Sequence, residues 1–206
     1  GNKVMMGGGT NALYQTNRTI EIYDPAAAAG SKWTTLTGTA GATDLLADKN
    51  RRGAVAQALA NGKVLVFGGY STAPFTDGEL ITIGAANASS VAVAFADAGS
   101  PFSNIIPAGA GKWLLFGASE RATTSTKTTK IYTESTGLLT AGPNLGFGRI
   151  APAVVSLGGT KTLIAGDNGM PGPNTPMEGM ASYDIYDSSN NSIVTKTLTS
   201  SQDSMN

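Results

Sequence analysis

Two residue types that carry much of the chemistry of active sites are missing from this 206-residue sequence, which contains neither cysteine nor histidine. Without cysteine the chain forms no disulfide and offers no thiolate metal ligand or cysteine nucleophile. Without histidine it lacks the commonest general base and the commonest metal ligand, which excludes a Ser-His-Asp hydrolase. We therefore expect no cofactor, no transition-metal site and no catalysis by this chain alone.

Charge is also scarce, since only 14% of the residues are charged, and the 14 Lys and Arg balance the 14 Asp and Glu. With no excess of positive charge to neutralise phosphates, we do not expect a nucleic-acid partner. No apolar run approaches the roughly 18–20 residues that a membrane-spanning helix needs, so we expect no membrane span. A two-carboxylate glycosidase stays open by residue type, although the acidic residues fall mainly in turns.

The residues that are present favour β-structure. Hydrophobic residues make up 41% of the chain and occur in short runs separated by glycine and other turn residues. Four runs share one pattern, in which a lysine opens the run and a glycine follows five residues later. The lysines, at spacings of 60, 49 and 49 residues, are Lys3, Lys63, Lys112 and Lys161. The glycines are Gly8, Gly68, Gly117 and Gly166. This self-similarity indicates a repeat of about 50 residues.

A second marker follows each glycine and ends another short strand. It stands 15 residues after the first three glycines and 20 after the fourth, at Tyr23, Ile83, Tyr132 and Tyr186. A further strand precedes the lysine, as residues 53–59 and 150–157 show most clearly. Arg51 or Arg52 opens the first of these strands and Arg149 opens the second. Each unit thus contains four short antiparallel strands, which is the composition of a propeller blade.

The expected units are residues 1–51, 52–100, 101–148 and 149–206, and the first begins directly at its second strand. We expect the second strands to supply the core, through Phe67 and Phe116 and through the set Leu65, Leu114 and Leu163. The only helix candidate is residues 43–50, a run too short to be stable alone. Because the chain opens with Gly1-Asn2-Lys3, which is neither a signal peptide nor an initiator methionine, it looks like a processed product or a piece of a longer polypeptide.

These markers resemble Kelch repeats. The first unit carries the resemblance best, with Gly8-Gly9, then Tyr23-Asp24-Pro25, then Trp33. The second retains Gly68-Gly69, and the fourth pairs Gly166-Asp167 with Tyr186-Asp187. The resemblance implies an all-β Kelch-like β-propeller of four repeats. It also implies a larger ring of six or seven blades, of which this chain would be a part; the alternative is a closed four-bladed propeller.

The predicted function is a non-catalytic binding, adhesion or structural scaffold module, extracellular or at the cell surface, whose partner is a protein or a glycan. Assembly with other chains, or with the rest of a larger propeller, is part of this prediction. The loops between second and third strands would share one face, where binding usually occurs. These loops are residues 10–18, 70–77, 119–128 and 167–181. The candidate contact residues are Asn168, Met170, Asn174, Met177, Met180, Tyr70, Phe75 and Arg121.

Two other functions stay open. The chain could be a segment of a secreted propeller enzyme, an oxidase or a glycan-active enzyme, with catalytic residues elsewhere; copper-radical oxidases of this superfamily need a Cys-linked Tyr and His ligands that are absent here. It could also be an intracellular Kelch adaptor. Arg51-Arg52 fits either an acidic ligand or hydrogen bonds to neighbouring turns, and the second is favoured. The Gly7-Gly9 run and the turn from Asp187 to Asn191 lack the full phosphate-loop and calcium-loop patterns.

Overall fold

The computed structural model describes residues 3–8, 20–38, 51–70, 75–84, 87–93, 102–118, 126–166 and 182–197. The chain divides into two compact units, Gly1–Ala98 and Gly99–Asn206. Each unit holds two of the expected repeats. The helix candidate at residues 43–50 lies outside the described residues.

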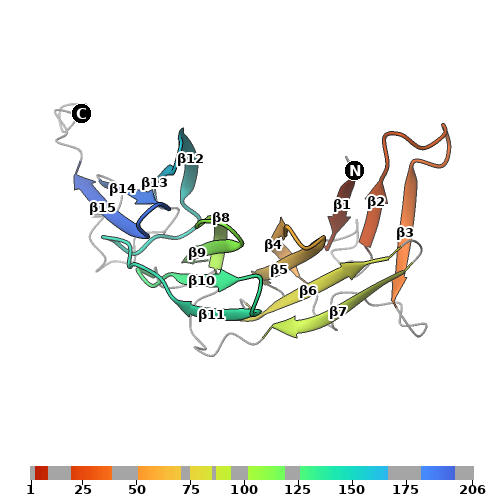
Figure 1. Ribbon diagram of the computed structural model, residues 1–206, viewed down its shortest axis with the longest axis horizontal. Coiled ribbons are helices and arrows are strands. Elements are labelled where there is room, and N and C mark those ends of the chain that lie inside the picture. The colour runs from red at the N-terminus through yellow and green to blue at the C-terminus, as the bar shows by residue number, and fades with distance from the viewer. Residues whose placement is uncertain are drawn as a thin grey trace, which may run out of the picture. The chain divides into compact units, whose positions relative to one another are not determined.

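The first unit contains one seven-stranded sheet with the order β1-β2-β3-β7-β6-β5-β4 (Figure 1). The first repeat supplies three antiparallel strands: β1 (Val4–Gly7), β2 (Ile20–Tyr23) and β3 (Trp33–Gly38). The second repeat supplies four: β4 (Arg52–Ala58), β5 (Lys63–Tyr70), β6 (Gly78–Ile83) and β7 (Asn87–Val93). A short parallel pairing of β3 with β7, at Thr37 with Asn87 and Gly38 with Ala88, joins the two groups.

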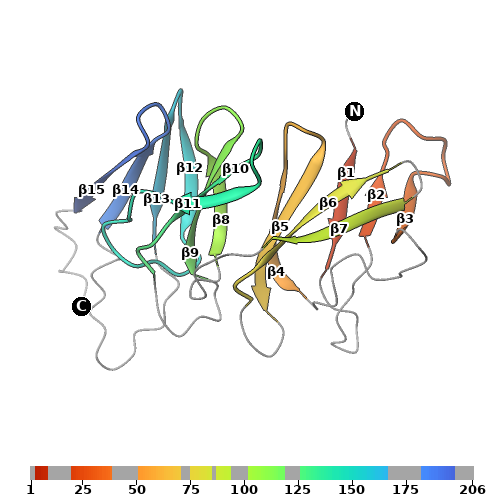
Figure 2. The ribbon, with the colours of Figure 1, turned by 60° about the horizontal axis from the view of Figure 1, so that its bottom comes forward.

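The second unit contains two four-stranded antiparallel meanders (Figure 2). The third repeat forms β8 (Phe102–Pro107), β9 (Lys112–Ala118), β10 (Lys130–Thr133) and β11 (Leu138–Ala141). The fourth repeat forms β12 (Ala153–Gly158), β13 (Lys161–Ala165), β14 (Ser182–Asp187) and β15 (Ser192–Thr197). The described chain is therefore all-β, as the sequence predicts, and none of its sheets closes on itself.

The lysine–glycine pattern marks the second strand of every repeat. Lys63, Lys112 and Lys161 are the first residues of β5, β9 and β13, and Lys3 directly precedes β1. The glycine five residues later has a positive φ in all four repeats, between 64° and 78°. Glycine adopts this conformation without steric cost, whereas other residues rarely do. The repeated glycine thus marks the end region of each second strand: it directly follows β1 and β13, and it stands two residues before the end of β5 and one before the end of β9.

Cross-strand register corrects one position of the repeat. The residue after each motif lysine pairs with the aromatic marker, as Val4 does with Tyr23 and Trp113 with Tyr132. In the second repeat the register pairs Val64 with Ile81 and not with Ile83. Ile81 is fully buried and Ile83 only half-buried. The prediction of Ile83 was wrong because a constant spacing from Gly68 takes no account of a connection two residues shorter.

Each unit has a core between its two repeats. In the first unit, Ile20 and Ile22 of β2 pack with Val64 and Val66 of β5 and with Ile81. The second unit's core includes residues from both of its repeats, on five strands and one connecting segment: Ile106, Leu114, Phe116, Ile131, Leu145, Ile164 and Tyr186. Successive residues of a strand point to opposite faces, so each second strand presents alternate residues to its unit's core: Val64 and Val66 of β5 in the first unit, and Leu114 and Phe116 of β9 in the second.

The predicted core residues are confirmed in the second and third repeats and not in the fourth. Leu65, Phe67, Leu114 and Phe116 all have no exposed surface. Leu163 is only half-buried, and its neighbour Ile164 is buried instead. Leu163 occupies the position of Leu114, whose face is covered by the fourth repeat in the second unit's core. Leu163 itself belongs to neither core cluster of the described residues.

Candidate binding surface

The candidate surface predicted from the sequence consists of the segments that connect the second and third strands of the repeats. Of the predicted contact residues, only Tyr70 and Phe75 belong to the described part of the chain. The remaining six, Arg121, Asn168, Met170, Asn174, Met177 and Met180, lie outside the described residues. Tyr70 ends β5 and Phe75 follows it shortly before β6, and both side chains are half-buried.

Phe75 is held against the body of the second repeat. Its backbone N–H donates to the carbonyl of Gly69 at 2.8 Å. Its ring lies 5.0 Å from the central guanidinium carbon of Arg51, a distance at which a cation and an aromatic face attract each other. These two contacts place Phe75 beside the end of β5, which Tyr70 closes.

The side chain of Arg51 forms hydrogen bonds to both β5 and β6. Its side chain is 1% exposed. Its Nε donates to Oε1 of Glu79 at 3.0 Å, and one terminal nitrogen donates to Oδ1 of Asp77 at 2.7 Å. The other terminal nitrogen donates to the carbonyl of Gly68 at 2.8 Å. With two carboxylates and a motif carbonyl as partners, Arg51 is a structural residue, as the favoured hypothesis holds.

Arg149 makes the same connections in the fourth repeat. It is fully buried, and its Nε donates to Oδ2 of Asp184 at 2.9 Å. One terminal nitrogen donates to the carbonyl of Gly166 at 3.2 Å, and the other to the carbonyl and hydroxyl of Ser182. Asp184 also accepts from the backbone N–H of Gly146 and the hydroxyl of Thr195. All these groups are satisfied, as buried charge requires.

The two arginines occupy one position of the repeat. Each stands 17 residues before the glycine whose carbonyl it binds. Their acidic partners are also equivalent, because Glu79 pairs with Val66 and Asp184 with Ile164, each three residues after a motif lysine. Sequence reasoning found the arginines and missed both carboxylates. The sequence did contain a signal for these carboxylates, because an acidic residue stands two positions before Ile81 and another stands two positions before Tyr186.

At the opposite ends of the second strands, the motif lysine pairs with the aspartate that follows the tyrosine. Lys3 Nζ lies 3.1 Å from Asp24 Oδ2, and Lys161 Nζ lies 2.6 Å from Asp187 Oδ2. The Lys161 hydrogen bond, followed by bonds from Ser189, holds the pKa of Asp187 well below its usual range. Lys3 likewise lowers the pKa of Asp24. These pairs explain why lysine opens the strand in the first and fourth repeats.

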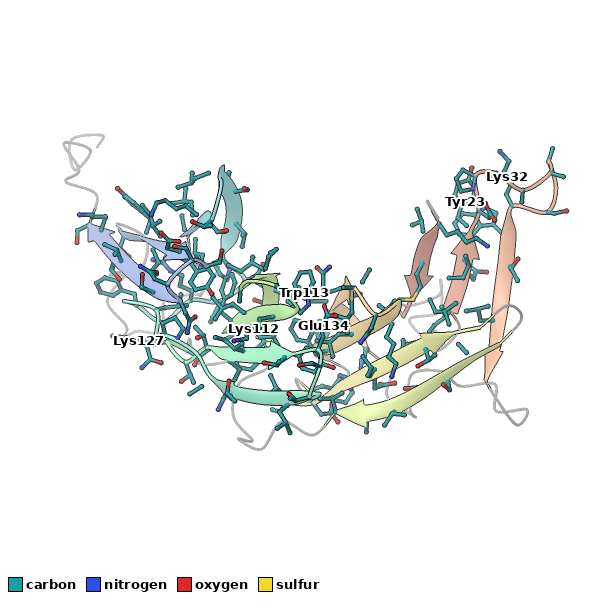
Figure 3. The ribbon with its side chains drawn as sticks, in the orientation of Figure 1. Tyr23, Lys32, Lys112, Trp113, Lys127 and Glu134 are labelled. Carbon is teal, nitrogen blue, oxygen red and sulfur yellow. The ribbon has the colours of Figure 1, made fainter. Side chains whose placement is uncertain are left out.

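The third repeat uses a different polar pair at this end. The indole N–H of Trp113 donates to Oε1 of Glu134 at 2.7 Å, and Figure 3 shows the two side chains next to each other. Burial, and secondarily the charge of Glu134, raises the pKa of the adjacent Tyr132. Burial also raises the pKa of Tyr186 in the fourth repeat. Tyr132 and Tyr186 are thus buried core residues that contribute through packing.

The acidic residues of the described ranges are scattered, and the calcium-like spacing near the C-terminal hairpin has a structural explanation. Nowhere among them do three acidic side chains gather closely enough to hold an ion. The turn from Asp187 to Asn191 is a polar hairpin between β14 and β15, in which Asp187 accepts from the N–H and hydroxyl of Ser189. Asn191 has a φ of 52° and accepts from the hydroxyl of Tyr186. Turn geometry accounts for this Asp-Ser-Asn spacing.

No protein-family model matches the chain, and no curated protein matches it. Among the described residues there is also no helix with the length and apolar character required to cross a bilayer.

Proposed function

We propose that this chain is part of a Kelch-like β-propeller and serves as a non-catalytic binding, adhesion or structural scaffold module outside the cell, with a protein or a glycan as its partner. The observation that carries this proposal is the common end of the four second strands. Each strand has a glycine with positive φ at or near this end, five residues after a lysine. Loops that start from one repeated position on rigid sheets are an arrangement that binding modules use.

The polar residues beneath these loops support a scaffold role. Arg51 and Arg149 bind carboxylates and motif carbonyls of their own repeats, and each arginine is at most 1% exposed. Buried charged side chains whose hydrogen bonds are satisfied hold the neighbouring backbone in one conformation. They are not placed to donate protons to a substrate or to accept them.

Apolar side chains on the outer face of the fourth repeat support further blades in a larger ring. Cross-strand register aligns Val155, Leu163, Ile185 and Val194 in one row across four strands. Val155 is 54% and Val194 51% exposed, and Leu157 on the same strand as Val155 is equally open. In the third repeat, the position of Leu163 is Leu114, which is buried against the next repeat. Terminal repeats of a finished array usually have a polar outer face.

The first repeat has an apolar outer face as well. Val4, Tyr23 and Trp33 form a row across β1, β2 and β3, with the two aromatic rings 5.0 Å apart. Val4 is 54% and Trp33 53% exposed. The residue equivalent to Tyr23 in the fourth repeat is Tyr186, which is fully buried against the preceding repeat. The apolar outer faces of the first and fourth repeats are surfaces that packing against further repeats of a larger ring would bury.

The binding function is tested by altering the loops and leaving the sheets intact. One variant deletes residues 172–176, and a second replaces Met170, Met177 and Met180 by serine. A control variant carries Thr136→Ala and Ser189→Ala in the hairpin turns at the other ends of the strands. We expect binding to a glycan array or to a panel of immobilised matrix proteins to be lost in the loop variants and retained in the control. Unchanged binding by folded loop variants, or turnover of sugar or alcohol substrates by the wild-type chain, would overturn the proposal.

A further inference from the structure

The main chain of Arg149 binds both ends of the connection between β9 and β10, which we call the third-repeat loop. At the start of this loop, the N–H of Ala118 donates to the carbonyl of Arg149 at 2.8 Å. At its end, the N–H of Arg149 donates to the carbonyl of Thr126 at 3.2 Å. These contacts belong to two isolated β-bridges, Ala118 with Ile150 and Thr126 with Arg149. The segment that leads into the fourth repeat thus holds the third-repeat loop at its two ends.

The side chain of the same residue binds both ends of the connection between β13 and β14, the fourth-repeat loop. One terminal nitrogen donates to the carbonyl of Gly166, which directly follows β13, at 3.2 Å. The other donates to the carbonyl of Ser182, the first residue of β14, at 3.3 Å. Arg149 is fully buried, so water does not compete for these bonds. One residue therefore binds the bases of two neighbouring loops, one through its main chain and the other through its guanidinium.

The backbone just after Arg149 adopts an unfavourable conformation that adds a further bond to the third-repeat loop. Ala151 has a φ of 45°, which is left-handed and disfavoured for a residue with a Cβ, and a residue before proline is ordinarily extended. Its N–H donates to the carbonyl of Ala118 at 2.9 Å, so Ala118 is bonded on both sides of Ile150. Strain of this kind persists only where the surrounding structure fixes the conformation. The connection between the two repeats is therefore rigid at this point.

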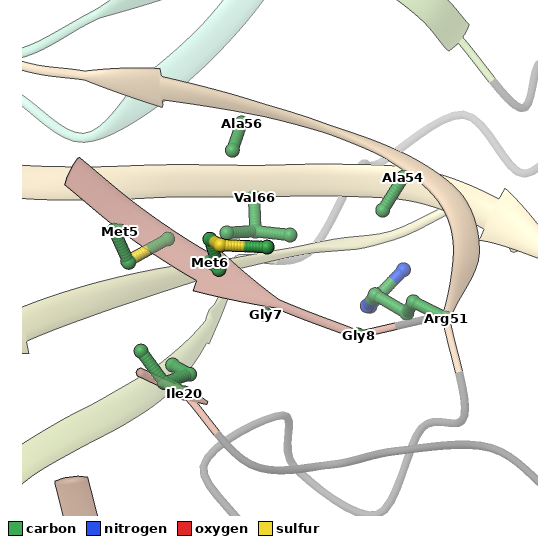
Figure 4. A pocket seen from close by; sticks show the side chains of 9 residues that line it. All are labelled: Met5, Met6, Gly7, Gly8, Ile20, Arg51, Ala54, Ala56 and Val66. Carbon is green, nitrogen blue, oxygen red and sulfur yellow. The ribbon is translucent and has the colours of Figure 1, made fainter. Parts of the chain in front are cut away.

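Arg51 occupies the same repeat position in the first unit and provides a matched comparison. Its guanidinium binds the two ends of the loop of its own repeat, at the carbonyl of Gly68 and at Asp77. The residue two positions later is Gly53, which adopts its φ of 62° without steric cost. Arg51 also borders a cavity of about 260 Å³ between β1, β2, β4 and β5 (Figure 4). Because this space lets a replacement side chain relax, a variant of Arg51 is a suitable control for one of Arg149.

We propose that Arg149 is a positioning residue that couples the third-repeat loop to the fourth-repeat loop. Because the same residue binds one loop through its main chain and the other through its guanidinium, a displacement of either loop base shifts the other. A partner that holds one loop therefore also orders the base of the other, and the coupling acts equally in both directions. The existence of a partner rests on the function proposed above, whereas the coupling is a property of the second unit and is measured without a partner.

Residue-specific hydrogen exchange, followed by NMR on the whole 206-residue chain, tests the coupling. The reporters are the amides of Ala118 and Ala151, at the base of the third-repeat loop. The double variant Arg149→Met with Asp184→Leu removes the side-chain bonds to the fourth-repeat loop, leaves no unpaired buried charge and retains the backbone groups of residue 149. We expect the protection of both reporter amides to fall at least about tenfold, as loss of a charge-assisted hydrogen bond implies. Arg149→Lys, which retains the charge without the planar fork, should produce a smaller fall.

Two controls separate this coupling from a general loss of stability, with the core amide of Leu115 as the internal reference. Ile193→Ala trims a side chain that packs against the core of the second unit and leaves every bond of Arg149 in place. It should lower the protection of the reporters no more than that of Leu115. The matched double variant in the first unit, Arg51→Met with Glu79→Leu, should leave the reporters unchanged.

Gly117→Ala tests the coupling in the opposite direction. The added Cβ would lie 2.8 Å from Pro152 and so displaces the base of the third-repeat loop. The reporter is the amide of Gly146, which donates to Asp184, the carboxylate partner of Arg149, at 3.1 Å. We expect its protection to fall relative to Leu115.

The proposal is overturned if the reporters of the third-repeat loop keep their protection in both Arg149 variants, or lose no more than Leu115 does. It is also overturned if Gly146 does not respond to Gly117→Ala. If the double variant does not fold, Arg149→Lys provides the same comparison. A chain whose loops bind no partner but whose reporters respond as expected would contradict the proposed function and leave the coupling in place.

Discussion

Arg149 and Asp184 form an ion pair in which both side chains are fully buried, with Nε donating to Oδ2 at 2.9 Å. The pair links the segment just before β12, the first strand of the fourth repeat, to β14, its third strand. Both partners make additional hydrogen bonds. The corresponding pair in the second repeat is Arg51 with Glu79. The same ion pair thus organises two repeats at the base of their loops.

Removing one member of this pair should be strongly destabilising. Arg149→Ala leaves the carboxylate of Asp184 buried without its cation, and we expect a loss of about 3–5 kcal/mol in denaturant unfolding. The double variant Arg149→Met with Asp184→Leu should lose less than the sum of the single changes, because no unpaired charge remains buried. Lys196→Ala, at an exposed position, is the control and should change little. Additive losses would show that the two residues act independently.

Gly117 and Gly166 allow the cost of a left-handed backbone conformation to be measured separately from the cost of a steric clash. A Cβ on Gly117 would lie 2.8 Å from Pro152 and 2.9 Å from the hydroxyl of Ser103, whereas a Cβ on Gly166 would meet nothing within 4 Å. Both have positive φ, 70° and 78°. Gly166→Ala should therefore cost roughly 1–2 kcal/mol, from the left-handed conformation alone. Gly117→Ala should cost clearly more in the same unfolding measurement. Equal losses would mean that Pro152 moves away without cost.

Equivalent leucines should differ in their contribution to stability. Leu114 has no exposed surface, and Leu163, at the same position of the fourth repeat, is half-buried. Leu114→Ala should cost about 2–5 kcal/mol, because it removes a fully buried side chain and leaves a cavity. Leu163→Ala should cost less than half as much in isolated protein. If additional repeats cover the fourth one in a longer form of the protein, the two costs should converge there.

The ion pair of Lys161 and Asp187 predicts a specific response to acid. Because the folded-state pKa of Asp187 is depressed, its contribution to stability is present above the unfolded value, about 3.9, and is lost as the pH falls towards the folded value. In Lys161→Met the pKa of Asp187 should rise, as followed by NMR titration of the side-chain carboxyl. Lys3→Met is the matched control, which should raise the pKa of Asp24 and leave Asp187 unchanged. An unaltered Asp187 titration in Lys161→Met would assign the shift to Ser189.

The pattern of lysine, apolar run and glycine that marks the second strands could be recognised from the sequence alone. A lysine, an apolar run and a glycine predict a buried strand with a turn at its end, because alternation and positive φ are properties of a few consecutive residues. The glycines all have the expected positive φ. Trp33 opens β3, and Pro152 stands just before β12, where a residue without an N–H does not interrupt the ladder.

The sequence by itself determined the all-β class, the second strands and the position of the arginines, because these depend on neighbours along the chain. The register that makes Ile81 the counterpart of Tyr132 appeared only when strands paired, since pairing absorbs differences in loop length. The carboxylates Glu79 and Asp184 likewise became recognisable only across the sheet. Burial of Leu114 and exposure of its equivalent Leu163 depend on which repeat covers each face. The alternation of residues along a strand defines its two faces, but only the tertiary packing determines which residues cover each face.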